Sequence, residues 1–247
     1  MYLIGLDGRS KPTSWIKRLV IMISIALLAL GIAVFTPSAQ AGEDAWVQVN
    51  QNGFEIGSGQ SLGMIVNDGY LYDCASSIFG LQVMQYDGSR WIAVNEPGFG
   101  NVFNQRGGAR SIDGILYVGT YNLFGGESWR YDGNNNWTQI ASGGFGDTNN
   151  HSIRAESQQG GTPYVGTGNN STGCEIWRYD GGTSWTRVDG GVSPGNGGFG
   201  DPNNNQVWNM VNLGGQLYAA IENPTTGCEV WRYDGGTSWT RVDGGVS

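Results

Sequence analysis

The chain is poor in cations, histidine and cysteine, and each shortage disfavours a class of function. Its 247 residues contain 13 Lys and Arg against 21 Asp and Glu, with one histidine and three cysteines. An acidic surface repels phosphate backbones, so we do not expect nucleic acid as a partner. The single histidine, His151, cannot build a zinc site, and no C-x-x-C pair is present. Neutral ligands such as sugars, or cations, remain open.

The N-terminus has the three parts of a secretory signal. A basic segment ends at Lys17-Arg18, an apolar run follows over residues 19–35, and Ala39-Gln40-Ala41 offers a small-x-small cleavage site. This pattern predicts a hydrophobic signal helix within a signal peptide over 1–41. The alternative is an uncleaved anchor, and only in that case do we expect membrane contact. Either way the rest of the chain is exported, to the periplasm, the cell surface or the medium.

The expected mature chain, residues 42–247, has nine arginines, no lysine and 20 acidic residues, a formal charge of −11. It also holds 40 of the 43 glycines, without a collagen-like period. High glycine content is compatible with disorder, but nine of the ten tryptophans lie in this part and argue against it, because disordered chains are poor in aromatic residues. Glycine alternating with aromatic and β-branched residues instead favours short strands joined by tight turns.

An internal repeat dominates the sequence. The pentapeptide W-R-Y-D-G starts at Trp129, Trp177 and Trp231, and a decayed copy, M-Q-Y-D-G, starts at Met84. Each copy is preceded by a Gly-Phe pair, and these pairs are spaced by 45, 46 and 54 residues. A period near 45 residues indicates an array of small β units.

Each unit contains four segments with strand character. In the last copy they are residues 207–212, 217–221, 229–233 and 239–242, separated by Gly- and Asn-rich turns. Four antiparallel strands per repeat are typical of a β-propeller blade, so the sequence predicts an all-β propeller. The alternative is a β-solenoid, whose coils are shorter.

The repeat boundaries give a domain map. We expect a lone strand over 46–50 and blades over 53–97, 98–143, 144–197 and 198–247. The last copy stops soon after its own fourth strand, where the copy before it continues into a new Gly-Phe pair. We interpret the chain as about four blades of a larger ring, with a true four-bladed ring as the alternative.

Two propeller families share local features with these repeats. Leu217-Tyr218, followed by Tyr233-Asp234 and Trp239, resembles a kelch-type blade, although the double glycine of that family is replaced around Gly166. The turn from Asp180 to Trp185 is similar to the Asp-box of sialidase-like secreted propellers. The resemblance covers residues 46–247 and implies architecture only, because both groups include enzymes and binding modules. A sialidase-like arginine cluster cannot be mapped onto this chain.

The repeated residues are expected to be structural. Alternation along a strand places the Trp and Tyr of each pentapeptide on one face, where blades pack together; ligand stacking is the alternative. We expect Glu and Arg at i, i+3 to pair with one another, or with partners in the next blade, because both become glutamine together in the first copy. The aspartates should cap the turn before the fourth strand. These residues are Trp129, Trp177, Trp231, Tyr131, Tyr179, Tyr233, Asp132, Asp180, Asp234, and the pairs Glu127/Arg130, Glu175/Arg178 and Glu229/Arg232.

The three cysteines, Cys74, Cys174 and Cys228, are predicted to be free buried thiols. Cys174 and Cys228 occupy the same slot in consecutive copies. Equivalent points on neighbouring blades lie too far apart for a disulfide, whose Cα atoms are within about 7 Å.

Candidate ligand-binding residues lie in two loops of each repeat, before the first strand and after the second. Both loop types emerge on one face of a propeller, and their Asp, Asn and Thr side chains suit sugar hydroxyls or Ca²⁺. Turn formation alone is the alternative explanation. The candidates are Asp147, Asn149, Asn150, Asn170, Asp201, Asn203, Asn204 and Asn223, with Arg106, Arg110 and Arg154 flanking them and Asp147 and Asp201 as candidate Ca²⁺ ligands.

The sequence thus favours an exported propeller that binds a glycan or an extracellular protein. The turn aspartates recur in every blade, which argues against one catalytic centre, so we do not expect an enzyme and assign no catalytic residue or cofactor other than the candidate Ca²⁺. One alternative is a propeller glycoside hydrolase or lyase whose catalytic residues lie partly outside the chain. The other is a structural envelope repeat without ligand.

Overall fold

The computed structural model describes residues 47–191 and 196–244. The chain divides into two compact units, 1–47 and 48–247. The first unit, with the predicted signal peptide, lies almost wholly outside the described residues. Among the described residues no helix is long and apolar enough to cross a membrane.

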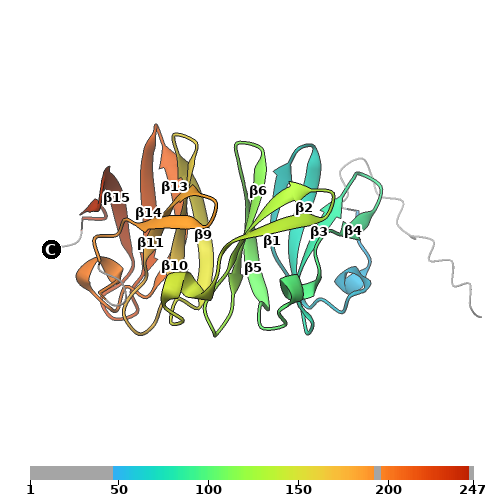
Figure 1. Cartoon of the computed structure of the whole chain (residues 1–247), viewed down its shortest axis with the longest axis horizontal. Coiled ribbons are helices and arrows are strands. Elements are labelled where there is room, and N and C mark those ends of the chain that lie inside the picture. The colour runs from blue at the N-terminus through green and yellow to red at the C-terminus, as the bar shows by residue number, and fades with distance from the viewer. Residues whose placement is uncertain (1–46, 192–195, 245–247) are drawn as a thin grey trace, which may run out of the picture. The chain divides into compact units, whose positions relative to one another are not determined.

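The second unit consists of four consecutive blades, each a four-stranded antiparallel sheet in simple up-and-down order, as predicted (Figure 1). Strands predicted in the last repeat agree with the structure to within two residues. Blade 1 holds β1 (Gln60–Asn67), β2 (Tyr70–Ser77), β3 (Gly80–Tyr86) and β4 (Trp91–Ala93); blade 2 holds β5 (Arg106–Ile112), β6 (Ile115–Tyr121), β7 (Ser128–Gly133) and β8 (Asn136–Ala141). Blade 3 holds β9 (Ser152–Gln159), β10 (Thr162–Gly168), β11 (Ile176–Gly181) and β12 (Ser184–Arg187); blade 4 holds β13 (Gln206–Leu213), β14 (Gln216–Glu222), β15 (Glu229–Gly235) and β16 (Ser238–Arg241).

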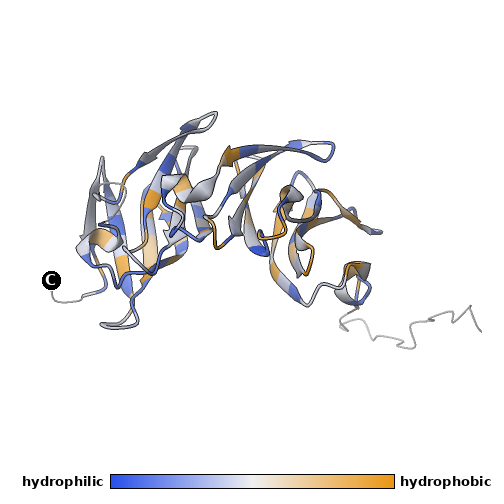
Figure 2. Cartoon of the chain, turned by 60° about the horizontal axis from the view of Figure 1, so that its bottom comes forward, coloured by the Kyte–Doolittle hydropathy of each residue, from blue (hydrophilic) through white to orange (hydrophobic). Residues whose placement is uncertain are grey.

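Single backbone pairs link the later blades, Tyr121 with Ser152 and Gly168 with Gln206. Apolar side chains of each blade meet those of the next, and Figure 2 shows apolar colour along the strands with hydrophilic colour at many turns. The core is therefore a series of layers between neighbouring sheets, as in β-propellers.

Each Gly-Phe pair forms a short 3₁₀ turn between blades, at η1 (Asn52–Glu55), η2 (Pro97–Gly100), η3 (Gly143–Gly146) and η4 (Gly198–Gly200). Phe145 has a φ of 62°, a conformation that costs a non-glycine residue about 1–2 kcal/mol. Its ring stacks on Trp177 with centroids 4.7 Å apart and meets Trp185 edge-on at 5.2 Å. This aromatic burial offsets the strain, and Phe99 and Phe199 repeat the arrangement.

Two contacts repeat at the blade interfaces. The tyrosine of each second strand meets the tyrosine of the next blade's third strand, as Tyr72 meets Tyr131 at 6.1 Å. The fourth-strand tryptophan donates its indole N–H to a carbonyl of the preceding blade, as Trp185 does to Ile140 at 2.8 Å. The repeat tyrosines and the fourth-strand tryptophans thus lie at the interfaces between blades.

The lone strand predicted over 46–50 is not formed by its described residues. Val49 nevertheless accepts the indole N–H of Trp91 at 3.1 Å, as the end of a preceding fourth strand does for the other tryptophans. Residues 47–50 thus occupy the position of a fourth strand without the partner strand that would make them one.

Candidate functional site

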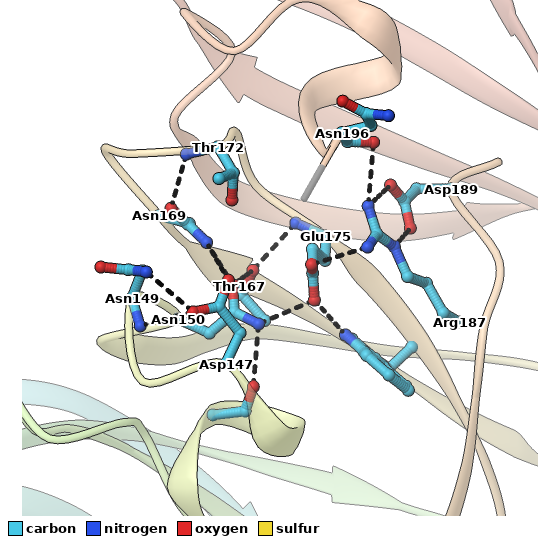
Figure 3. A network of polar contacts seen from close by, with 12 residues as sticks. Asp147, Asn149, Asn150, Thr167, Asn169, Thr172, Glu175, Arg187, Asp189 and Asn196 are labelled. Atoms are coloured by element: carbon cyan, nitrogen blue, oxygen red, sulfur yellow. Dashed lines mark hydrogen bonds and ion pairs between the residues drawn. The ribbon is translucent and has the colours of Figure 1, made fainter. Parts of the chain in front are cut away.

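The polar loops on one edge of the blades form a connected network around a buried asparagine (Figure 3). In blade 3, Asn150 donates to the Gly144 carbonyl at 2.8 Å and to Glu175 at 2.7 Å. Its own carbonyl oxygen accepts from Thr167 and Asn169. All hydrogen-bonding capacity of this buried amide is therefore used inside the protein, as buried polar groups require.

The same network recurs in blades 2 and 4. Asn104 donates to Gly98 and Glu127, and Asn204 donates to Gly198 and Glu229. Glycine is needed at Gly144 because its φ is 61° and a Cβ there would lie 2.8 Å from the Asn150 side chain. The network ties the turn between blades to the third strand.

The predicted loop residues divide between inside and outside. Asn150, Asn204, Asn223 and Asp147 are buried in the network, whereas Asn149, Asn170 and Asn203 are exposed. The exposed amides of Asn149 and Asn203 donate to the aspartate two residues before them, at 2.9 Å. A ligand can reach these exposed asparagines. Of the flanking arginines, Arg106 is exposed, and Arg110 and Arg154 are half-buried.

The two candidate Ca²⁺ ligands are surrounded by donors. One oxygen of Asp147 accepts from the backbone and side chain of Asn149, and the other accepts from Asn169. Backbone and side-chain N–H groups of Asn203 lower the pKa of Asp201. Among the described residues no group of three His, Cys, Asp or Glu could hold a metal ion. Carboxylates satisfied by N–H groups are poorly placed to bind a cation.

The predicted Glu–Arg pairing is wrong. Glu175 binds Arg187 of the fourth strand at 2.8 Å, and Glu229 binds Arg241 at 2.8 Å. The arginine at i+3 turns away, as Arg178 does to meet Asp180 at 2.8 Å. Residues three apart in a strand lie on opposite faces, so the two charges of the motif cannot meet.

The aspartates of the repeat also differ from prediction. Asp180 accepts from Arg178 and from the hydroxyl of Thr186 across the hairpin, and Asp132 and Asp234 make equivalent contacts. Only Asp87, in the decayed copy, makes the predicted turn bonds, accepting from the backbone of Ser89 and Arg90. Blade 1 has no arginine at the corresponding strand position, which leaves its aspartate for the turn.

The cysteines are free, as predicted, and two of them, Cys74 and Cys174, are buried. Cys228 is exposed, contrary to prediction, because it lies at the end of the chain's last long loop with no further blade described beside it. His151 packs edge-on against Tyr121 at 5.3 Å, and burial lowers its pKa.

A cleft between blades 1 and 2 was not predicted. It encloses about 720 Å³ at the edge opposite the polar loops, beside the β1–β2 and β5–β6 turns. Its lining is aromatic and amide-bearing: Asn67, Tyr70, Tyr72, Gln85, Tyr131, Asn134 and Asn135, with Asp68 and Asp132 among the acidic residues. A concave site with a few convergent polar groups is the usual form of a small-ligand site.

The cleft has a cause in the sequence. Gln85 pairs with Tyr72 across β2 and β3, at the position where Arg130 pairs with Tyr117 and Arg178 with Tyr164 in the next two blades. The shorter, uncharged glutamine donates to the Tyr72 hydroxyl at 2.6 Å and leaves room that a guanidinium would fill. The decay of the repeat in blade 1 was thus the signal that could have located this site.

The pKa values of two lining residues are shifted from their ordinary values. Burial raises the pKa of Tyr72, so its hydroxyl stays neutral and can both donate and accept. The hydroxyl of Thr138, with help from Arg130, lowers the pKa of Asp132. This carboxylate stays ionised and is unsuited to act as a general acid.

The loops of blades 1 and 2 carry a second unpredicted feature. Positions that are Asn, Ser, Thr or Pro in blades 3 and 4 are large and apolar here, and all are half or more exposed: Ile78, Phe79, Val102, Phe103, Leu123 and Phe124. The rings of Phe103 and Phe124 touch edge-on at 5.0 Å.

No protein-family model and no curated protein matches this chain. Solved structures resemble it at low identity. They include an acylaminoacyl peptidase complex (11% identity, TM-score 0.47, 72% of this chain and 26% of that one). They also include the β-propeller domain of the Trilobed protease from Pyrococcus furiosus (11% identity, TM-score 0.46, 72% of this chain and 50% of that one). A third is the SapL1 lectin with α-methyl fucoside (17% identity, TM-score 0.47, 74% of this chain and 62% of that one). The chain spans about a quarter of the peptidase. Similarity at this level does not indicate a shared function.

Proposed function

We propose that this protein is an exported binding module that holds a neutral carbohydrate in the cleft between blades 1 and 2. The observation that carries the proposal is the replacement of an inter-blade arginine by Gln85, which accompanies a cleft of about 720 Å³. Export is supported by the signal-like residues 1–41.

The lining fits sugar chemistry. Tyr70 and Tyr131 offer apolar ring faces, and the amides of Asn67 and Gln85 offer both donors and acceptors for hydroxyl groups. Asp68 and Asp132 give the rim negative charge, which disfavours anionic ligands.

The test is a glycan array followed by calorimetric titration of the sugars that bind. Gln85→Arg restores the arginine of the other interfaces and should fill the cleft, so affinity should fall at least about tenfold, about 1.4 kcal/mol. The matched control is Arg178→Gln, which changes the interface between blades 3 and 4 and contacts no residue of the cleft lining, so it should leave affinity unchanged.

Two further readouts separate the alternatives. An equal loss of affinity in Asn149→Ala or Asn203→Ala would indicate that the sugar binds at the polar loops instead of in the cleft. Release of reducing sugar would favour the hydrolase. Unchanged binding by a folded Gln85→Arg variant would refute the cleft as the site.

A further inference from the structure

Two first strands contain a β-bulge at the same place. In β9, Ile153 pairs with Thr167 and Ala155 with Gly166, which leaves Arg154 as the extra residue. In β13 the same shift leaves Trp208 unpaired. Bulges re-aim a side chain away from the regular pleat and are frequent beside functional sites. Here they bring the guanidinium carbon of Arg154 to 5.1 Å from the centre of the Trp208 ring.

A second arginine belongs to the same group. Arg106 opens β5 opposite Tyr121, and Tyr121 pairs with the first residue of β9. The strands that carry the two arginines, β5 and β9, are in contact with each other. Burial, and then the charge of Arg106, lower the pKa of Arg154. Such an arrangement is unfavourable unless an anion neutralises it.

No carboxylate does so among the described residues. Every other described arginine except Arg110 forms an ion pair with Asp or Glu: Arg90, Arg130, Arg178, Arg187, Arg232 and Arg241. Glu222 accepts the indole N–H of Trp208 at 2.6 Å and makes no ion pair with Arg154. In so acidic a chain, two adjacent arginines without a carboxylate are an exception.

Aromatic side chains lie beside the two arginines. The Tyr121 ring meets His151 at 5.3 Å, and the Trp208 side chain is about half exposed, at 53%. Arg106 is at the opposite end of β5 from the turn that lines the carbohydrate cleft, a separation of roughly 20 Å along a seven-residue strand. The two sites are therefore distinct.

We propose that Arg106 and Arg154 bind an oxyanion, the carboxylate or sulfate group of a small ligand, which lies beside the exposed face of Trp208. Arginine presents paired N–H donors that match two oxygens of such a group. This site does not rest on the proposed function of the cleft, and it gives an acidic protein one place where an anion is attracted.

The experiment is a titration of the full chain with sodium acetate, sulfate and phosphate at constant ionic strength, followed by tryptophan fluorescence. Subtracting the response of Trp208→Phe isolates the signal of Trp208. We expect saturable binding, weakened at least about tenfold in Arg154→Met and in Arg106→Met. The control Arg90→Met, at an exposed turn of blade 1, should bind like the wild type.

Thermal unfolding gives an independent readout. Without anion, Arg154→Met should be at least as stable as the wild type, because the mutual repulsion is removed, and added anion should stabilise only the wild type. Saturation by acetate over sulfate and phosphate would assign a carboxylate ligand, and the reverse a sulfate or phosphate group. A response that does not saturate, or that is equal in all variants, would overturn the proposal.

Discussion

Blades 3 and 4 follow the repeat closely, whereas blades 1 and 2 depart from it, and the departures come in sets. In blade 3 the buried Glu175 has Arg187 as its partner. In blade 2 the arginine is replaced by Gln139, and Asn101 and Asn104 donate to Glu127 instead. In blade 1 the glutamate itself is replaced by Gln82. A buried charge is thus retained only where the structure around it supplies partners.

The same contrast separates the surfaces. Blades 3 and 4 have polar loops closed by the asparagine network, and their inter-blade tyrosines enclose an arginine at the one interface between them. Blades 1 and 2 have apolar loop tips and an open cleft beside Gln85. Regular copies therefore act as scaffold, and the candidate sites appear where the repeat is broken.

The largest effect is expected from Arg187→Met. This change leaves Glu175 and Asp189 buried without their guanidinium, so the free energy of unfolding should fall by about 3–5 kcal/mol. Urea denaturation measures it. The matched control in blade 2 is Gln139→Met, at an uncharged position, which should cost under about 1 kcal/mol. Equal losses in both blades would contradict the comparison.

A pH-dependent effect is expected at Glu156. Both of its carboxylate oxygens are buried without a hydrogen-bond partner, and burial raises its pKa from 4.5 to about 8. The native state thus holds a proton that the unfolded state releases, so stability from this group is complete below pH 4.5 and is lost as the pH rises toward 8.

Glu156→Met tests this, because the equivalent position in blade 4 is Met210. The variant should lose the decline between pH 4.5 and 8 and gain up to a few kcal/mol at pH 8. Thermal melts across that range provide the measurement, with Glu96→Gln on an exposed turn as control. An unchanged slope would show that Glu156 does not titrate there.

The smallest effect on stability is expected at the loop tips. Phe103→Asn with Phe124→Ser gives blade 2 the polar character of blade 3, and should change the unfolding free energy by no more than about 0.5 kcal/mol. Binding of a hydrophobic dye should nevertheless fall, because contiguous exposed apolar side chains attract such probes. The reverse graft, Asn149→Phe with Ser171→Phe, should raise dye binding. Dye binding that follows neither change would place the accessible apolar surface elsewhere.

Local features of the sequence predicted the blades well and the sites poorly. The strands of blade 4 were found from alternation and turn residues, which act within a few positions of each other. Asn149 and Asn150 are the same residue type side by side, yet one is exposed and the other is the centre of a buried network. The difference is made by residues 17 and 25 positions further on, Thr167 and Glu175.

The candidate sites show the same limit. The glutamines of the first copy were visible in the sequence as departures from the repeat. That Gln85 lines a cleft was not visible, because the opposite wall includes Tyr131 of the next blade. Arg106 and Arg154 were noticed as variable residues. Their approach to each other and to Trp208 follows from bulges that only strand pairing reveals.

By itself, then, the sequence determined the repeat, the four-stranded unit and the acidic character of the chain, because these depend on periodicity and composition. The tertiary structure alone decided which charges pair, which asparagines are buried and where a cleft opens. Those outcomes depend on contacts between side chains that are distant in the chain. At equivalent positions of two blades, Gln85 donates to Tyr72 beside an open cleft, whereas Arg130 pairs with Asp132.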